Sequence, residues 1–309
     1  MTYVGLSDIA CDLGQPVDAM LGWARHRDLD PDFLDRMKRN RVEVFRTARG
    51  RPPHELCLGA IDRVLHQTGR DLAGFGGAIH FHSLHSSAPV FGTGYRAALR
   101  QRGLPDSAFF FSVSHQRCIG FHLALKLAQA RLEQTPDLGD ILLFGGDIAL
   151  DEGQRNIDGL AIESDAASAA IVSRHAGCRV VSTEIRTEGA YFQHDKPFDP
   201  RRYQLTAFRE ILKLIETVLS NGGIEAKDID SVITHNGNID MWGRIFAALV
   251  IPEEKHFRTN YTSIGHTNCS DFPINLMTFI KQSRPEPGSN LLVLAIAYGR
   301  SFGCSLLRT

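Results

Sequence analysis

The fold is decided by the stretch Val113-Ser114-His115-Gln116-Arg117-Cys118-Ile119-Gly120-Phe121-His122-Leu123-Ala124-Leu125. The preceding run Phe109–Val113 is short and apolar, as in a strand, whereas residues 119–132 place apolar side chains on nearly every face of a helix and contain no proline. This pattern predicts a helix that is buried all round. A cysteine at the beginning of such a helix lies where free N–H groups and the helix dipole favour an anion, and hence the thiolate.

Composition places the chain among ordinary globular proteins. It has 309 residues, 43% hydrophobic and 22% charged, which is enough for one large core or two packed halves. The net charge of −1 offers no surface for nucleic acid. No apolar run reaches the length of a membrane span, and the N-terminus lacks a basic segment followed by an apolar one. We therefore expect a cytoplasmic protein without a membrane or nucleic-acid partner.

Neither the cysteines nor the histidines form a metal-binding pattern. The six cysteines, at positions 11, 57, 118, 178, 269 and 304, lack the short spacings of zinc sites or of a disulfide framework. His80 and His82 share one face of a predicted strand, but no carboxylate or cysteine lies near them in the sequence. We expect no metal site.

Predicted strands alternate with predicted helices along the chain, which indicates an α/β fold with helices on the sheet faces. The first half contains the strand Val4–Ile9, helical pieces that include Leu13–Arg25, and the amphipathic helix Pro53–Thr68. The second half contains the periodic helix Thr206–Asn221, which two glycines end, and closes on the strands Leu291–Ala297 and Cys304–Arg308. Two domains of similar order are expected, over residues 1–175 and 176–309.

Taken alone, Cys118 is better explained as a core cysteine at a strand–helix junction, because free cysteines are among the most buried residues. Its neighbours favour a nucleophile. The sequence around it resembles the nucleophile motif Ala-Cys-Ala-Gly-Phe-x-x-Ala-Leu of the ketoacyl-ACP synthase III branch of the thiolase superfamily, and the matching residues are Cys118, Gly120, Phe121, Ala124 and Leu125. Residues 162–173 resemble that family's Phe-Gly-Asp-Gly-Ala-Gly segment, with its glycines replaced by Ser164, Ala166 and Ser168.

Two partner motifs follow in the family's order. The first, Thr234-His235-Asn236-Gly237-Asn238, is similar to Pro-His-Gln-Ala-Asn, so His235 takes the position of the catalytic histidine. The second begins at Gly265-His266-Thr267, thirty-one positions after His235 when counted to His266, where the family has Gly-Asn-Thr-Ser-Ala-Ala-Ser-x-Pro. His266 thus replaces the catalytic asparagine. The resulting Cys-His-His set is similar to that of the elongating ketoacyl synthases.

The resemblance implies a duplicated αβαβα five-layer fold and a dimer. It also implies that Cys118 carries an acyl group from coenzyme A or an acyl carrier protein, which would be substrates, with no metal or redox cofactor. The N–H groups of Cys118 and Gly299 would form the oxyanion hole. Further residues expected to meet substrate are Asn238, Phe91, which could reach the partner's pocket, and Arg39, in a basic segment that is otherwise a solvated loop.

Three functions remain open at this stage. In decarboxylative condensation with a malonyl thioester, His235 and His266 would hold the thioester carbonyl. In plain acyl transfer, typical of specialised metabolism, His235 would act as general base on a hydroxyl or amine. A non-catalytic subunit of a heterodimeric synthase would have no use for Cys118, His235 and His266 together, so an acyltransferring enzyme is favoured.

Overall fold

The computed structural model describes residues 3–18, 35, 38–39, 41–83, 93–149, 151, 155–157, 161–189, 200–297 and 299–309. Ten strands form one mixed sheet in the order β12-β11-β13-β14-β10-β1-β9-β6-β4-β5. Their bounds are β1 Val4–Leu13, β4 Phe75–Phe81, β5 Phe109–Val113, β6 Asp140–Asp147, β9 Ala166–Arg174, β10 Cys178–Thr187, β11 Ser231–Thr234, β12 His256–Phe257, β13 Asn290–Ala297 and β14 Ser301–Arg308.

The sheet consists of two five-stranded halves with the same plan. In the first half, β5, β4 and β6 are parallel, and β9 and β1 follow as antiparallel neighbours. The second half repeats this with β12, β11 and β13 parallel, followed by antiparallel β14 and β10. A short antiparallel pairing of β1 with β10, at Gly5↔Arg179 and Leu6↔Cys178, joins the halves. Whether the chain divides into separate domains after residue 175 stays a prediction.

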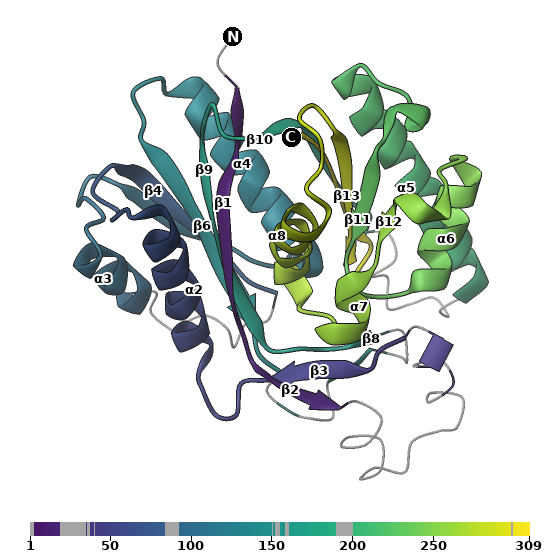
Figure 1. Ribbon diagram of the computed structural model, residues 1–309, viewed down its shortest axis with the longest axis horizontal. Coiled ribbons are helices and arrows are strands. Elements are labelled where there is room, and N and C mark those ends of the chain that lie inside the picture. Colours follow the sequence, from purple (N-terminus) through teal and green to yellow (C-terminus); the bar gives the residue numbers. More distant parts are fainter. Residues whose placement is uncertain are drawn as a thin grey trace.

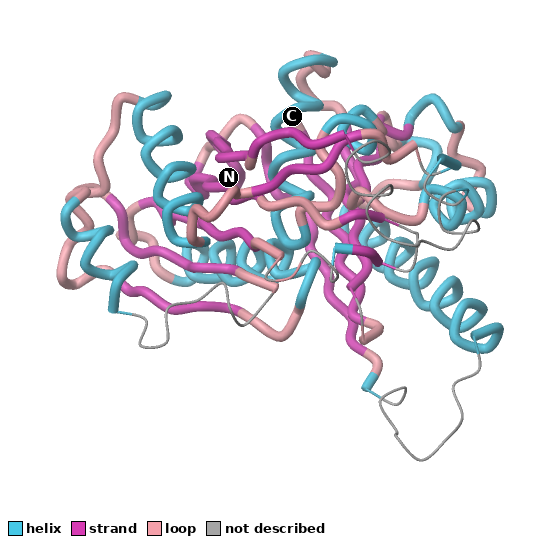
Figure 2. Tube along the Cα trace, turned by 90° about the horizontal axis from the view of Figure 1, so that it is seen from below, coloured by secondary structure: helices cyan, strands magenta, loops and turns pink. Residues whose placement is uncertain are grey.

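Helices complete five layers that can be followed across Figure 1. The helices α2 (Pro53–Thr68) and α3 (Thr93–Gln101) cover the outer face of the first half-sheet, and α5 (Pro200–Gly222) and α6 (Ile239–Ala248) cover that of the second. Between the half-sheets lie α4 (Gly120–Gln134) and α8 (Asp271–Ser283). The view from below also shows helices on both sides of the strands (Figure 2). This architecture confirms the predicted α/β, thiolase-like fold.

The central layer explains why the helix after Cys118 is apolar on every face. Side chains of α4 and α8, among them Phe121, Leu125, Phe272 and Leu276, are buried in one cluster with inward-facing residues of both half-sheets. A helix with a sheet on each side has no face left for solvent, so amphipathicity is lost. Each of these large side chains contributes about 1.5–3 kcal/mol through burial. The central layer therefore holds Cys118 at the start of a rigid element.

One expected helix is wrong. The chain over Leu13–Arg25 does not begin as a helix, because Leu13 ends β1 and residues Gln15–Asp18 form the short strand β2, which pairs with β3 (Val44–Thr47). The ladder between β1 and β9 continues as far as Leu13↔Ala166, so its backbone hydrogen bonds override the helical pattern. Residues 19–25 of the expected helix lie outside the described residues.

The shorter elements lie around the site. They are β7 (Asn156–Ile157), β8 (Ala161–Ile162), α7 (Thr259–Ser263) and the 3-10 turns η4 (Arg117–Ile119), η7 (Ala226–Asp228), η8 (Glu253–Lys255) and η9 (Asn268–Ser270). Within the described part of the chain, no helix has both the length and the apolar character that crossing a bilayer requires.

Candidate active site

Cys118 lies in a strained turn between a strand and a helix. β5 ends at Val113, and the backbone then passes through left-handed conformations at His115 (φ 63°) and Arg117 (φ 46°) before α4 begins at Gly120. Neither residue is glycine, so the turn stores strain that the strand and the buried helix must hold. The partly buried Cys118 packs against Ala295 and Ala297 of the other half-sheet.

His266 lies against this thiol. Its Nε2 is 3.3 Å from Cys118 Sγ, and its Nδ1 is 2.5 Å from Asp271 Oδ2. Since a carboxylate only accepts, Nδ1 carries the proton and Nε2 is an acceptor when the ring is neutral. Gly265, at φ 81°, makes the turn that brings His266 in, and a Cβ there would lie 2.6 Å from Ser164 Oγ. Cys118, His266 and Asp271 thus have the connectivity of a nucleophile–base–carboxylate triad.

Asp271 is almost completely buried, and both of its carboxylate oxygens accept hydrogen bonds. Besides His266, it accepts hydrogen bonds from the Thr267 N–H and hydroxyl, both at 2.7 Å, and from the Asn236 N–H at 2.7 Å. Burial raises the pKa of Asp271, but His266 and Thr267 outweigh it and the net shift is downward. Burial lowers the pKa of His266, and Asp271 with Cys118 reverse this, so that the pKa of His266 lies well above its usual value.

His235 is held in the opposite tautomer. It follows β11, and its Nδ1 accepts a hydrogen bond of 3.0 Å from the Ile296 N–H, so Nε2 carries the proton. Burial, aided by the neighbouring His266, lowers the pKa of His235 to about 3. The ring lies 5.5 Å from that of His266 and edge-on to Trp242. His235 is therefore a neutral imidazole whose remaining nitrogen is a donor.

The structure thus brings Cys118, His235 and His266 together, and the catalytic roles predicted for them stay predictions. Asn238 begins α6 in a left-handed conformation and its Oδ1 accepts the Met241 N–H, so its side chain caps this helix. Gly299, at φ 88°, follows β13 two residues after Ala297, which packs near Cys118. Its part in an oxyanion hole stays a prediction.

The other two substrate-binding residues, Arg39 and Phe91, stay predictions. Arg39 is exposed, in a short helical piece, and Phe91 lies outside the described residues. Arg46 of β3, from the same basic segment as Arg39, instead borders the site: its Nη2 donates 2.9 Å to the Ser263 carbonyl, three residues before His266.

Sequence reasoning missed Asp271 and Asn268. The family motif has serine at both positions, so the change from asparagine to His266 comes together with a change from serine to Asp271. This paired departure was a usable signal, since a histidine and a carboxylate five residues apart can form one unit. Asn268, at φ 54°, places Oδ1 3.7 Å from Cys118 Sγ.

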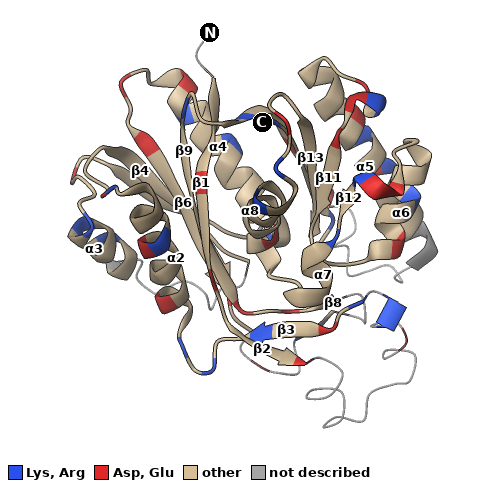
Figure 3. Cartoon of the chain, in the orientation of Figure 1, with Lys and Arg blue, Asp and Glu red and all other residues tan. Residues whose placement is uncertain are grey.

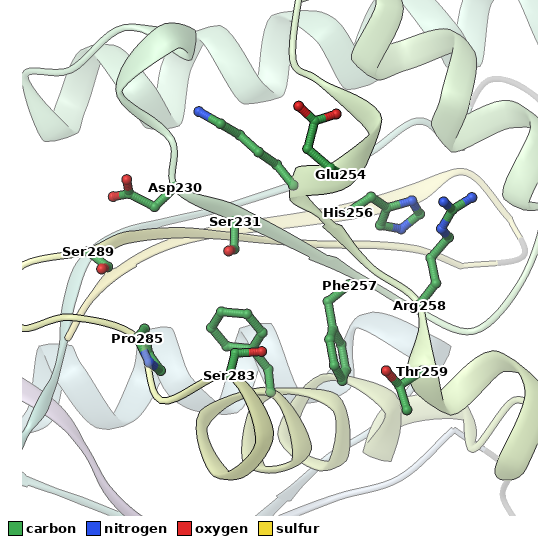
Figure 4. Close-up of a pocket in the computed structure, with 12 residues that line it drawn as sticks. Asp230, Ser231, Glu254, His256, Phe257, Arg258, Thr259, Ser283, Pro285 and Ser289 are labelled. Atoms are coloured by element: carbon green, nitrogen blue, oxygen red, sulfur yellow. The ribbon is translucent and has the colours of Figure 1, made fainter.

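No metal cluster is found among the described residues. His80 and His82 are buried and their rings stack 4.9 Å apart, while His80 Nδ1 pairs with Ser112. A separate hollow of about 370 Å³ lies along β12 and the end of α8, and none of the triad residues lines it (Figure 4).

Comparison with known proteins identifies relatives of this chain. Residues 219–309 match the family model for 3-oxoacyl-[acyl-carrier-protein (ACP)] synthase III, C terminal. β-Ketoacyl-[acyl-carrier-protein] synthase III of Aquifex aeolicus is 25% identical over 224 residues, which cover 69% of this chain and 70% of the relative. That of Sodalis glossinidius is 24% identical over 241 residues, covering 72% and 74%.

Solved structures share the fold over the whole chain. ChlB3, described as an acyltransferase, superposes with a TM-score of 0.86 at 18% identity and covers 99% of this chain and 98% of its own. The Aquifex aeolicus synthase III structure gives a TM-score of 0.81 at 20% identity, covering 99% and 100%. The fold is that of the thiolase class. Within that class, the chain is similar to the ketoacyl synthase III proteins.

Proposed function

We propose that this protein is an acyltransferase that takes an acyl group from a thioester onto Cys118 and passes it to a hydroxyl or amine without condensation. The observation that carries the proposal is the contact of His266 Nδ1 with Asp271, 2.5 Å. It holds one proton on Nδ1, so Nε2 takes the thiol proton from the neutral ring, and the raised pKa of His266 favours keeping that proton as an imidazolium beside the thiolate. A nitrogen that exchanges a proton with the nucleophile serves acyl transfer, whereas decarboxylation requires donors aimed at a thioester carbonyl.

The first half-reaction loads the enzyme. Cys118 gives its proton to His266 Nε2 as Sγ attacks the thioester carbonyl carbon. The raised pKa of His266 allows the ring to keep this proton. His235 Nε2–H is a candidate donor to the developing oxyanion. The carbon–sulfur bond to the leaving thiol breaks, the proton on His266 passes to that thiolate, and the acyl group remains on Cys118.

The second half-reaction transfers the acyl group from Cys118 to the acceptor. An acceptor hydroxyl or amine gives its proton to His266 Nε2 while its oxygen or nitrogen attacks the acyl carbon, and Cys118 leaves and recovers the proton. Acylation removes Cys118 as one of the groups that raise the pKa of His266, which eases loss of the ring proton before this step. The base is thus His266, because Nδ1 of His235 is occupied by the Ile296 N–H.

Condensation with a malonyl thioester is the second candidate. It is favoured by the donor Nε2–H of His235, which suits a thioester carbonyl, and by the relatives named β-ketoacyl-ACP synthase III. A protonated His266 would supply the second donor. We regard transfer as better supported because Nε2 of His266 lies 3.3 Å from Cys118 Sγ, where it exchanges a proton with the nucleophile. A purely non-catalytic subunit would have no use for a buried triad.

The donor is proposed to be coenzyme A or an acyl carrier protein, as the relatives' names suggest. Support comes from Lys and Arg residues on and around β3 (Figure 3), of which Arg46 contacts the loop before His266. Arginine suits phosphate geometry and an acidic carrier surface. A homodimer and a cytoplasmic location are expected from the resemblance and complete the proposal.

Intact-protein mass spectrometry tests the proposal. Wild type and Cys118→Ala are incubated with a panel of acyl-CoAs and acyl carrier protein thioesters, and any acylated species then meets malonyl-ACP, an amine or an alcohol. We expect a mass gain on wild type only, and loss of the adduct to the amine or alcohol. Discharge by malonyl-ACP with release of CO₂ would make the protein a condensing enzyme. Equal turnover by Cys118→Ala would refute the nucleophile.

A further inference from the structure

Glu163 lies beside the triad and has no part in the mechanism above. It forms an isolated parallel bridge with His266: the Ser164 N–H donates 2.7 Å to the His266 carbonyl, and the His266 N–H donates 2.9 Å to the Ile162 carbonyl. Residues paired in this way project their side chains to the same side. The carboxyl of Glu163 therefore stands next to the imidazole that faces Cys118.

Asn268 connects Glu163 to the thiol. Its side chain hydrogen-bonds the Glu163 carboxyl and places Oδ1 3.7 Å from Cys118 Sγ. Asn268 is itself held in a left-handed conformation in the turn η9. The carboxyl, the amide and the thiol thus line one continuous polar edge of the reaction centre.

Arg155 holds the backbone of Glu163 through two hydrogen bonds. The Glu163 N–H donates 2.8 Å to the Arg155 carbonyl, and the Glu163 carbonyl accepts 3.2 Å from Arg155 Nη1. Arg155 forms a buried, bidentate ion pair with Asp165, at 2.7 and 2.9 Å. Burying such a pair is costly unless its geometry is good, and here it anchors the residue that carries the carboxyl.

The residue type at this position is also informative. When Ser164, Ala166 and Ser168 are aligned with the family glycines, Glu163 replaces the phenylalanine of the family motif. An apolar ring has given way to a half-buried carboxyl. Burial raises the pKa of Glu163, and the nearby His266 opposes this. The cost of desolvating this carboxyl is offset in part by Asn268, and a bound donor would offset it further.

We infer that Glu163 binds the acceptor, taking a hydrogen bond from an N–H or O–H group and presenting the nucleophile to His266. This rests on the proposed acyl transfer and narrows its acceptors to neutral or cationic amines and alcohols. An acceptor with its own carboxylate, including a malonyl unit, meets like charge at this edge and is disfavoured.

The test separates loading from discharge. Glu163→Gln keeps the shape and removes the charge, Glu163→Asp keeps the charge, and Glu216→Gln makes the same change on an exposed site of α5. Each variant is acylated with the acyl-CoA that loads wild type, and discharge is measured with glycinamide and with glycine, which differ by a carboxylate. The readouts are the rate of Cys118 acylation, the half-saturating acceptor concentration, and the ratio of the two discharge rates.

We expect Glu163→Gln to load normally but to need about tenfold more glycinamide, in keeping with one lost hydrogen bond to a charged group. Its preference for glycinamide over glycine should fall by a similar factor, whereas Glu163→Asp and Glu216→Gln keep the preference. An unchanged preference in a folded Glu163→Gln overturns the inference alone. If wild type never forms the acyl-enzyme, the proposed function fails with it.

Discussion

At the scale of a single residue, Asp271 connects the two motif loops of the site by hydrogen bonds. It accepts from His266 and Thr267 of one loop and from the Asn236 N–H of the other. Asp271→Asn keeps the volume but offers N–H groups where donors already point. We expect Cys118 acylation to slow by about 10²–10⁴-fold, as when a triad carboxylate is lost, and unfolding free energy to fall by about 1–3 kcal/mol. Single-turnover mass spectrometry and urea unfolding measure the two effects.

The exposed Asp137→Asn, at the end of the α4 region, is the matched control and should acylate like wild type. A folded Asp271→Asn that acylates normally would show that His266 needs no carboxylate.

Motifs predicted the proximity of Cys118, His235 and His266, because each has a family counterpart. They did not predict Asp271, since its role depends on a neighbour five residues away that has changed as well.

At the scale of single elements, substitutions of two glycines test the packing of β6 and of α4. A Cβ on Gly145 of β6 would lie 1.7 Å from the Phe81 carbonyl oxygen, so Gly145→Ala must push β6 away from β4. A Cβ on Gly120 of α4 would meet only ordinary contacts, beginning at 3.6 Å from Cys269. We expect Gly145→Ala to lose about 3 kcal/mol or more, and Gly120→Ala to be neutral or gain up to about 1 kcal/mol.

Urea unfolding of the two variants beside wild type measures the difference. A destabilised Gly120→Ala would mean that the first turn of α4 is packed more tightly than its contacts indicate.

The elements differ in how well the sequence predicts their bounds and burial. The helix after Cys118 was predicted as buried because its apolar residues occupy all faces, whereas β1 was cut short at Ile9. Its last residues pair with β9, and such long-range pairing leaves no local pattern.

The site depends on both halves of the molecule. Cys118 comes from the first half, whereas His235, His266 and Asp271 come from the second, and the buried layer of α4 and α8 sets their spacing. The α/β class was predictable from alternating strands and helices. The repeat of one plan in two halves was predictable from the family resemblance, because the sequence similarity between the halves is too weak to show it unaided. Disturbing the central layer should therefore disturb catalysis and stability together.

Buried neutral histidines make the whole molecule sensitive to acid. Burial is the first cause that lowers the pKa of His80, His122, His235 and His256, each to about 3 from an ordinary 6.5. Between pH 6.5 and 3 the unfolded chain binds these protons and the folded chain does not. The stability they contribute is complete above pH 6.5 and is lost as the pH falls towards 3. His266, whose pKa is raised, has the opposite dependence.

We therefore expect unfolding near pH 5 to take up about four protons per chain from these histidines. Urea unfolding at several pH values between 5 and 6.5 gives this number from the slope of unfolding free energy against pH. His122→Asn removes one buried titrating ring and should reduce the uptake by about one proton. An uptake near zero in wild type would mean that these rings reach water, and that His235 is not the fixed neutral donor on which the oxyanion assignment depends.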